Sequence, residues 1–159
     1  MTGVLIVALT IAAALGSGLV AGFFFAFSVV TMKALGRLPP EQGIAAMQSI
    51  NVVVLNPWFF TAFFGTAAAC VILATYSLFY WHAPGAIYLL AASALYLVGV
   101  ILVTIAFNVP LNNALAAVEP ASGEGADLWT PYLSAWTRWN HVRTAAPLLA
   151  AASFIMALR

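Results

Sequence analysis

The chain has 159 residues, of which 65% are hydrophobic and only 6% are charged, and its formal net charge is +1. Soluble proteins are about half apolar and about a quarter charged, so this composition excludes an ordinary soluble domain and indicates an integral membrane protein. The basic residues are scattered, which argues against nucleic acid as a partner. A single cysteine, Cys70, excludes an intrachain disulfide and a thiolate metal cluster. The length suits one domain, residues 1–159.

Four apolar segments are each long enough to cross a membrane as a helix, because about 20 residues span the hydrocarbon core. They cover residues 4–35, 57–80, 85–107 and 136–158. Backbone polar groups cannot stay unpaired in lipid, and the chain lacks the alternating strands of a barrel, so helices are the only fit. We therefore predict an all-α, integral membrane four-helix bundle, with a short amphipathic helix between the first and second spans.

The first span carries small residues at intervals of four, a pattern that predicts close packing against another helix. These residues are Ala14, Gly18, Gly22 and Ala26. A group of phenylalanines in the same region could line a cavity for an aromatic ligand, although core and lipid-facing positions are the commoner places for phenylalanine. This group consists of Phe23, Phe24, Phe25 and Phe27.

The predicted amphipathic helix covers about residues 40–55, starts with proline and an acid, and stops at Asn56, which suits the N-cap of the second span. Met47 and Asn51 are four residues apart, and Gln48 and Asn51 are three apart, so the three side chains can share one face. We expect Asn51 to point into the bundle and this face to contribute to substrate binding.

The third span and its extension carry a stripe of polar residues whose separations of eight, four and four keep them near one helix face. The stripe consists of Tyr96, Thr104, Asn108 and Asn112. Pro110, between the two asparagines, leaves a backbone carbonyl without its helical donor. The asparagines could satisfy that carbonyl, bridge helices or belong to a functional site. Residues 119–127, which follow, are predicted to be a solvated loop.

The fourth span opens with a run of polar and aromatic residues. The run consists of Trp136, Arg138, Trp139, Asn140, His141 and Arg143. Ionisable groups inside a span are costly, which makes them candidates for function. On a regular helix Asn140 and Arg143 share a face, whereas His141 lies about 160° from Arg143. Either the arginine stem curls around, or the first turn is irregular, or the two residues serve different surfaces; Arg138 and His141 form the alternative cluster.

The distribution of basic residues predicts the topology. Lys33, Arg37, Arg138 and Arg143 fall on one side of the predicted membrane, and only Arg159 falls on the other. Cytoplasmic loops carry the excess of basic residues, so both termini are expected outside the cytoplasm. We expect a multi-pass protein of a bacterial inner membrane.

Together these segments resemble a family of four-helix membrane proteins that includes fungal anthrone oxygenases and many bacterial members. The most specific parts are Asn51 in the segment QSIN, residues 108–112 with the sequence NVPLN, and residues 139–143 with the sequence WNHVR. The resemblance covers nearly the whole chain. The chain departs from the family pattern at residues 32–35, which read MKAL where the family often has MPAL.

The resemblance implies an O₂-dependent oxidation of an activated aromatic or polyketide-like molecule, of the anthrone to anthraquinone type. The residues permit it without a bound cofactor. We expect His141 to act as the base because histidine titrates near neutral pH, and Arg143, helped by Asn108 or Asn112, to hold the developing oxyanion. Replacing His141 by alanine should then abolish turnover. The expected substrate-binding residues are Asn51, Gln48, Met47, Trp139, Asn140 and Thr104.

Other functions stay open on the sequence alone. No metal site is expected, because His82 and His141 are predicted at opposite membrane faces and neither is accompanied by an acid in a span. A haem needs only one axial histidine and is compatible with the sequence. The alternatives to an oxygenase are a binding or transport protein for a small hydrophobic molecule, which could form a homo-oligomer, and a structural membrane subunit. The expected partners are a small hydrophobic molecule, O₂ and membrane lipid.

Overall fold

The computed structural model describes residues 2–159, and within this range every regular element is helical. Three helices in this part of the chain are long and apolar enough to cross a membrane: Gly3–Leu35, Pro57–Phe79 and Ala86–Ala116. The fourth long helix, α7 (Gly123–Ala157), is not among them, because charged and polar residues fill much of its first half. The predicted all-α membrane bundle is confirmed, with three of the four expected spans meeting this test.

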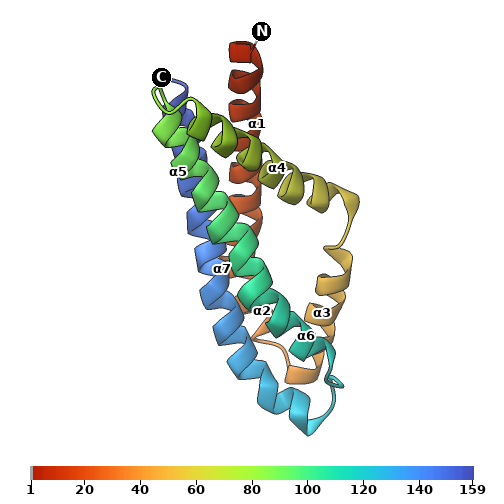
Figure 1. Ribbon diagram of the computed structural model, residues 1–159. Coiled ribbons are helices and arrows are strands. Elements are labelled where there is room, and N and C mark those ends of the chain that lie inside the picture. The colour runs from red at the N-terminus through yellow and green to blue at the C-terminus, as the bar shows by residue number, and fades with distance from the viewer. Residues whose placement is uncertain (1) are drawn as a thin grey trace.

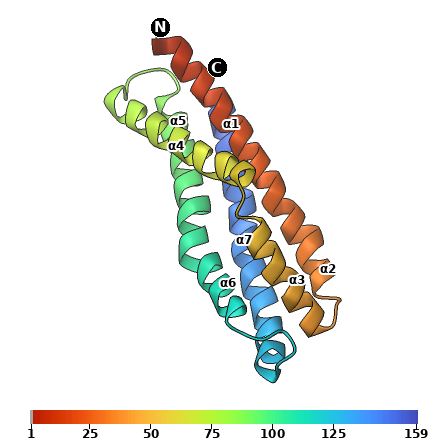
Figure 2. The same ribbon diagram turned by 90° about the vertical axis from the view of Figure 1, so that its right-hand side faces the viewer.

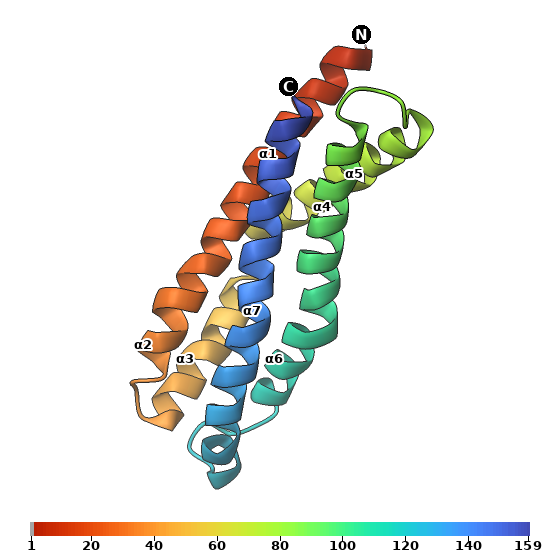
Figure 3. The ribbon, with the colours of Figure 1, turned by 90° about the vertical axis from the view of Figure 1, so that its left-hand side faces the viewer.

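The bundle is organised around α7. Helix α1 (Thr2–Ala26) and helix α5 (Ala86–Tyr96) run along opposite sides of α7, and both pack against it (Figures 2 and 3). Helix α4 (Pro57–Phe79) crosses the bundle obliquely and packs on α1 and α5 (Figure 1). The start of α1 and the C-terminus lie at the same end of the bundle, as the predicted topology requires.

The predicted packing stripe on α1 is confirmed at Ala14, which packs against the core, but not at its glycines. A side chain added at Gly18 or Gly22 would meet nothing within 4 Å, so these glycines face open space. Close packing occurs instead at Gly16, where a Cβ atom would collide with Thr66 of α4. The buried face of α1 includes Ser17 and Phe24, because the helix is rotated relative to the interval-of-four pattern. Beyond Ala26 the helix continues through a π-helical turn, η1 (Phe27–Thr31), into α2 (Met32–Leu35).

A sharp corner joins α3 (Pro40–Val53) to α4, and Asn56 forms it (Figure 1). The Asn56 Oδ1 atom accepts hydrogen bonds from the backbone N–H groups of Trp58 and Phe59, each at 3.1 Å. The predicted N-cap is therefore confirmed. The corner lets α3 run beside the lower part of α7 while α4 turns away across the bundle.

The predicted third span continues past residue 107 as one bent helical path. After α5 come two π-helical turns, η2 (Leu97–Leu102) and η3 (Thr104–Asn108), and then α6 (Val109–Ala116). The second π-helical turn comes just before Pro110, where the helical hydrogen-bond pattern must be interrupted in any case.

The predicted loop over residues 119–127 is shorter than expected. Ser122 caps α7, because its Oγ atom accepts a hydrogen bond from the Gly125 N–H at 3.0 Å, and α7 begins at Gly123. A serine followed by acids near the first turn favours a helix start, and this outweighs the glycines that suggested a loop.

Candidate functional site

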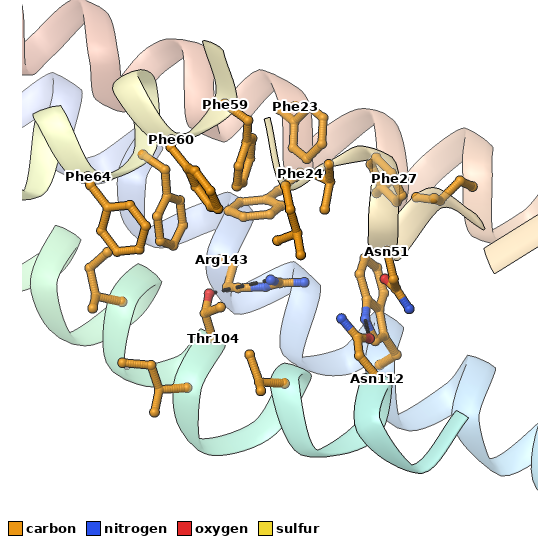
Figure 4. Close-up of a pocket in the computed structure, with 18 of the residues that line it drawn as sticks. Phe23, Phe24, Phe27, Asn51, Phe59, Phe60, Phe64, Thr104, Asn112 and Arg143 are labelled. Carbon is orange, nitrogen blue, oxygen red and sulfur yellow. Dashed lines mark hydrogen bonds between the residues drawn. The ribbon is translucent and has the colours of Figure 1, made fainter. Parts of the chain in front are cut away.

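A cavity of about 250 Å³ lies where α1, α3, α4, the α5–α6 path and α7 come together (Figure 4). Aromatic side chains are the largest group in its wall: Phe23, Phe24, Phe27, Phe59, Phe60, Phe63, Phe64 and Trp136. Four polar side chains reach the same cavity: Asn51, Thr104, Asn112 and Arg143. The rest of the lining is aliphatic or methionine. A largely apolar cavity with a few convergent polar groups is the usual form of a small-molecule site.

Arg143 is the one charged residue in the lining, and it is only 4% exposed. Its Nη2 atom donates to Asn140 Oδ1 at 2.9 Å, and its Nη1 atom donates to Thr104 Oγ1 at 3.4 Å. Its Nε atom is buried and has no hydrogen-bond partner within the described structure. The guanidinium also lies over two aromatic rings, with its carbon 4.2 Å from the centroid of Phe24 and 4.9 Å from that of Trp136. Arg143 therefore keeps donor capacity for a ligand.

No carboxylate neutralises this buried cation from within the cavity wall. The lining contains no aspartate or glutamate. The four acids of the chain, Glu41, Glu119, Glu124 and Asp127, are all exposed. A buried guanidinium is normally paired, so an unpaired one favours a ligand that is anionic or becomes anionic.

Asn140 holds the arginine in place and connects it to α1. Its Nδ2 group donates to the Phe24 backbone oxygen and to Ser28 Oγ, both at 2.7 Å, while its Oδ1 atom accepts from Arg143. Asn140 is fully buried and does not line the cavity. Within the structure Asn140 therefore positions Arg143, and it does not reach the cavity where a substrate contact was expected.

A second polar group lies beside Arg143 at the α3 and α6 end of the cavity. Asn112 Oδ1 accepts hydrogen bonds from the Tyr132 hydroxyl at 3.0 Å and from Trp136 Nε1 at 2.9 Å. Asn51 lies next to Asn112 in Figure 4, and its Nδ2 atom is buried without a hydrogen-bond partner in the residues described. This pair gives the cavity a polar end.

Five of the residues expected from the sequence do meet at the cavity: Met47, Asn51, Thr104, Asn112 and Arg143. Asn108 does not line it; its Nδ2 atom donates to the Trp136 backbone oxygen at 3.3 Å, so it bridges helices instead. Gln48 donates to the backbone oxygens of Leu115 and Val118 and ties α3 to α6. Asn108 and Gln48 therefore make hydrogen bonds within the protein, and neither reaches the cavity where substrate contacts were expected.

His141 and Trp139 both lie outside the cavity. His141 is exposed and does not line the cavity, because it lies on the opposite face of α7 from Arg143. Trp139 stacks on Phe107, with ring centroids 3.6 Å apart and planes 7° apart, also outside the cavity. Of the three geometries open for the fourth span, the structure adopts the one in which the two residues serve different surfaces.

The sequence reasoning missed the contribution of α4. Phe59, Phe60, Phe63 and Phe64 all line the cavity. Phe59 and Phe63 are four residues apart, as are Phe60 and Phe64, so the members of each pair lie on the same side of the helix. Figure 4 shows Phe60 and Phe64 across the cavity from Thr104. That spacing was a usable signal. Of the phenylalanines proposed on the first span, Phe23, Phe24 and Phe27 line the cavity, whereas Phe25 is exposed.

The part of the chain that the structure describes has no group of three histidine, cysteine, aspartate or glutamate side chains placed to hold a metal ion. His82 is exposed in the connection between α4 and α5, and neither histidine reaches the cavity. The donor chemistry of the site is therefore that of one guanidinium, two amides and a hydroxyl.

Comparison with known proteins gives one family match. The family model described as anthrone oxygenase matches residues 58–153. This range includes most of α4, the whole α5–α6 path and most of α7, and thus three of the walls of the cavity. No significant match to a curated protein or to a solved structure was found.

Proposed function

We propose, because the chain belongs to the anthrone oxygenase family, that it is a membrane-embedded, O₂-dependent oxygenase acting on an activated aromatic molecule. The reaction is of the anthrone to anthraquinone type. The observation that carries the proposal is the unpaired Arg143 guanidinium, which is buried in the wall of an aromatic cavity. Such a site suits a planar aromatic molecule that develops negative charge on one oxygen atom.

The aromatic wall supports binding of a flat ring system. Rings pair favourably in tilted, edge-to-face or offset arrangements, each contributing about 0.5–1.5 kcal/mol beyond the burial of area. The Phe23 ring is tilted by 42° relative to Phe27 and by 48° relative to Phe59, so the wall presents both faces and edges. A planar substrate can therefore be sandwiched by the wall without specific polar contacts along its length.

The proposed reaction consumes one O₂ and releases one water. Loss of a C–H proton turns the anthrone into an electron-rich enolate, which transfers one electron to O₂. The carbon radical and superoxide combine through a new C–O bond, and the peroxide takes up a proton. Loss of the second C–H proton then breaks the O–O bond, which leaves the carbonyl group and water. The substrate itself supplies the electrons, so we propose turnover without a bound cofactor.

Arg143 is assigned to the enolate oxygen. A fixed positive charge in a largely apolar cavity lowers the pKa of a nearby acid, here the substrate C–H group, by stabilising its anion. The described lining contains no histidine or carboxylate, so we assign proton removal to water rather than to His141. A haem placed in this cavity would likewise find no axial histidine in the wall.

We place the protein in a bacterial inner membrane with both termini outside the cytoplasm. The end of α2, which carries Lys33, and the adjoining Arg37 lie at the opposite end of the bundle from the termini (Figure 1). Basic residues at that end favour the cytoplasmic side for it.

The test is anthrone-dependent O₂ consumption by the protein in membranes. We expect consumption above that of membranes without the protein, with one anthraquinone formed per O₂. Anthracene, which has the same rings but no activated CH₂ group, is the matched control and should give no consumption. Equal rates with and without the protein would remove the oxygenase proposal.

The second candidate function is a binding protein for a small hydrophobic aromatic molecule whose oxygen atom can accept a hydrogen bond from Arg143, which the ring wall also favours. Binding of anthraquinone without any excess turnover of anthrone would support it.

A further inference from the structure

We infer that the substrate reaches Arg143 sideways from the hydrocarbon region of the membrane, through an apolar opening between α4 and the α5–α6 path. Five cavity-lining residues form this opening, which we call the lateral mouth: Leu55, Phe60, Phe64, Ile105 and Val109. The inference rests on the proposed function for the identity of the substrate, and it adds the route and a physical requirement on the substrate.

The lateral mouth is exposed although it belongs to the cavity. Its five side chains have exposed fractions between 39% and 62%, whereas Phe24 and Phe63, deeper in the same lining, are almost completely buried. The same five side chains therefore contact both the cavity and the outside of the protein. All five are apolar, so the opening offers no hydrogen bond to a polar molecule passing through it.

The two sides of the mouth belong to segments that cross the membrane. Phe60 and Phe64 lie on the span Pro57–Phe79, and Ile105 and Val109 lie on the span Ala86–Ala116. Side chains exposed on such spans face lipid tails, because about 30 Å of hydrocarbon surrounds them. The mouth therefore opens toward the hydrocarbon region and not toward water.

The polar groups lie beyond the mouth. Arg143 is almost completely buried, and Figure 4 shows it near Thr104 on the opposite side of the cavity from Phe59 and Phe60. A molecule entering from lipid meets rings and aliphatic groups first and the guanidinium last. The preferred substrate is thus a neutral, planar aromatic ketone or phenol that dissolves in the bilayer, enters oxygen end first and ionises only beside Arg143.

A second cavity offers a competing route. It has a volume of about 300 Å³, shares Phe23, Phe27 and Phe59 with the first cavity, and is lined on its outer side by Val53 and Ser49. Arg143 does not line it. A molecule arriving there would have to pass the side chains that the two cavities share before it reached the guanidinium.

The test compares tryptophan substitutions in vesicles of phosphatidylcholine, with radiolabelled anthraquinone as the probe. Ile105→Trp narrows the mouth. Leu102→Trp is the matched control, because Leu102 is exposed to a similar extent on the same helical path but does not line the cavity. We expect Ile105→Trp to slow both binding and release by about tenfold with a much smaller change in Kd, since a narrowed route alters rates more than equilibrium. Leu102→Trp should bind and release as wild type does.

Three results from the variants and the competitor would overturn the lateral route. The first is equal rates in the two variants. The second is slow binding and release in Val53→Trp alone, which would move the route to the second cavity. The third is competition by anthraquinone-2-sulfonate as strong as that of unlabelled anthraquinone, because a fixed sulfonate should not cross an apolar mouth.

The inference and the proposed function can fail separately. If Ile105→Trp slows binding and release while wild type shows no anthrone-dependent O₂ consumption, the lateral route stands and the oxygenase proposal fails. If wild type consumes O₂ and both tryptophan variants bind and release the probe at the wild-type rate, the oxygenase proposal stands and the lateral route fails. If wild type binds no anthraquinone at all, the route is overturned.

Discussion

The two faces of α7 differ in what they do with their polar residues. On one face Trp136, Asn140 and Arg143 follow one another at intervals of four and three, and all three are buried and bonded to neighbouring helices. On the other face Arg138 and His141 are exposed. Within eight consecutive residues, the same helix thus carries one cation into the protein and another out of it.

The difference shows that chemical type alone does not make a site. Burial of the Arg143 charge is costly, and it is offset by a charge-assisted hydrogen bond to Asn140, worth about 1.5–3 kcal/mol. Contacts with the faces of Phe24 and Trp136 add about 0.5–2 kcal/mol each. His141 is exposed and does not line the cavity, so its chemical type does not by itself connect it to the site.

The largest expected effect is the loss of the buried cation. Arg143→Gln should lower kcat for anthrone oxidation by about 100-fold or more, because it removes the charge assigned to the enolate oxygen. Arg143→Lys keeps a charge but loses the forked guanidinium that reaches both Asn140 and Thr104. Its kcat should therefore lie between those of wild type and Arg143→Gln. Rates of O₂ consumption on equal amounts of folded protein measure this. A Gln variant with the wild-type rate would remove Arg143 from the reaction.

The next effect concerns the residue that positions the arginine. Asn140→Ala removes one hydrogen bond to α1, one to η1 and the acceptor for Arg143, so it should lower both the free energy of unfolding, by about 1–3 kcal/mol, and kcat. Ser28→Ala removes only one of these bonds and should have the smaller effect on stability with kcat nearly unchanged. Thermal unfolding in detergent measures the stability of each variant, and O₂ consumption measures its kcat. A stable Asn140→Ala protein with normal kcat would contradict the positioning role.

A smaller effect is expected at the polar end of the cavity. Asn112→Ala leaves the Tyr132 hydroxyl and the Trp136 N–H without their acceptor, so the free energy of unfolding should drop by about 1–3 kcal/mol. The neighbouring Asn113 is exposed, and Asn113→Ala is the control that should leave stability unchanged. Equal unfolding temperatures for the two variants would show that the Asn112 bonds do not contribute.

Much of the fold could be predicted because its causes are local. Apolar length defined three spans, and a proline after an asparagine defined the corner at Asn56. The orientation of each helix about its own axis could not be predicted from spacing alone. Gly18 and Gly22 fit a packing pattern yet face open space, because the other helices lie against a different side of α1.

Only part of the candidate site could be predicted, because the orientation of each helix about its own axis decides which side chains reach the cavity. Helical geometry correctly separated His141 from Arg143, but the choice of which one faces the cavity depends on the neighbours of α7. Thr104, Asn108 and Asn112 form a stripe in the sequence, yet the π-helical turn Thr104–Asn108 changes the register between residues on either side of it. One asparagine lines the cavity and the other bridges to the Trp136 backbone. Such shifts leave no clear signal in a single sequence.

The smallest expected effect gives the sharpest test of the comparison between the two faces. His141→Ala should leave kcat and KM for anthrone within about twofold of wild type, because exposed substitutions away from a site usually change free energies by no more than about 0.5 kcal/mol. It is matched to Arg143→Gln, two residues along the same helix, and the two are compared in one O₂-consumption assay. Loss of turnover in a folded His141→Ala protein would mean that α7 presents its other face during the reaction. The base would then be His141, and the cavity described above would serve only to bind the ring system.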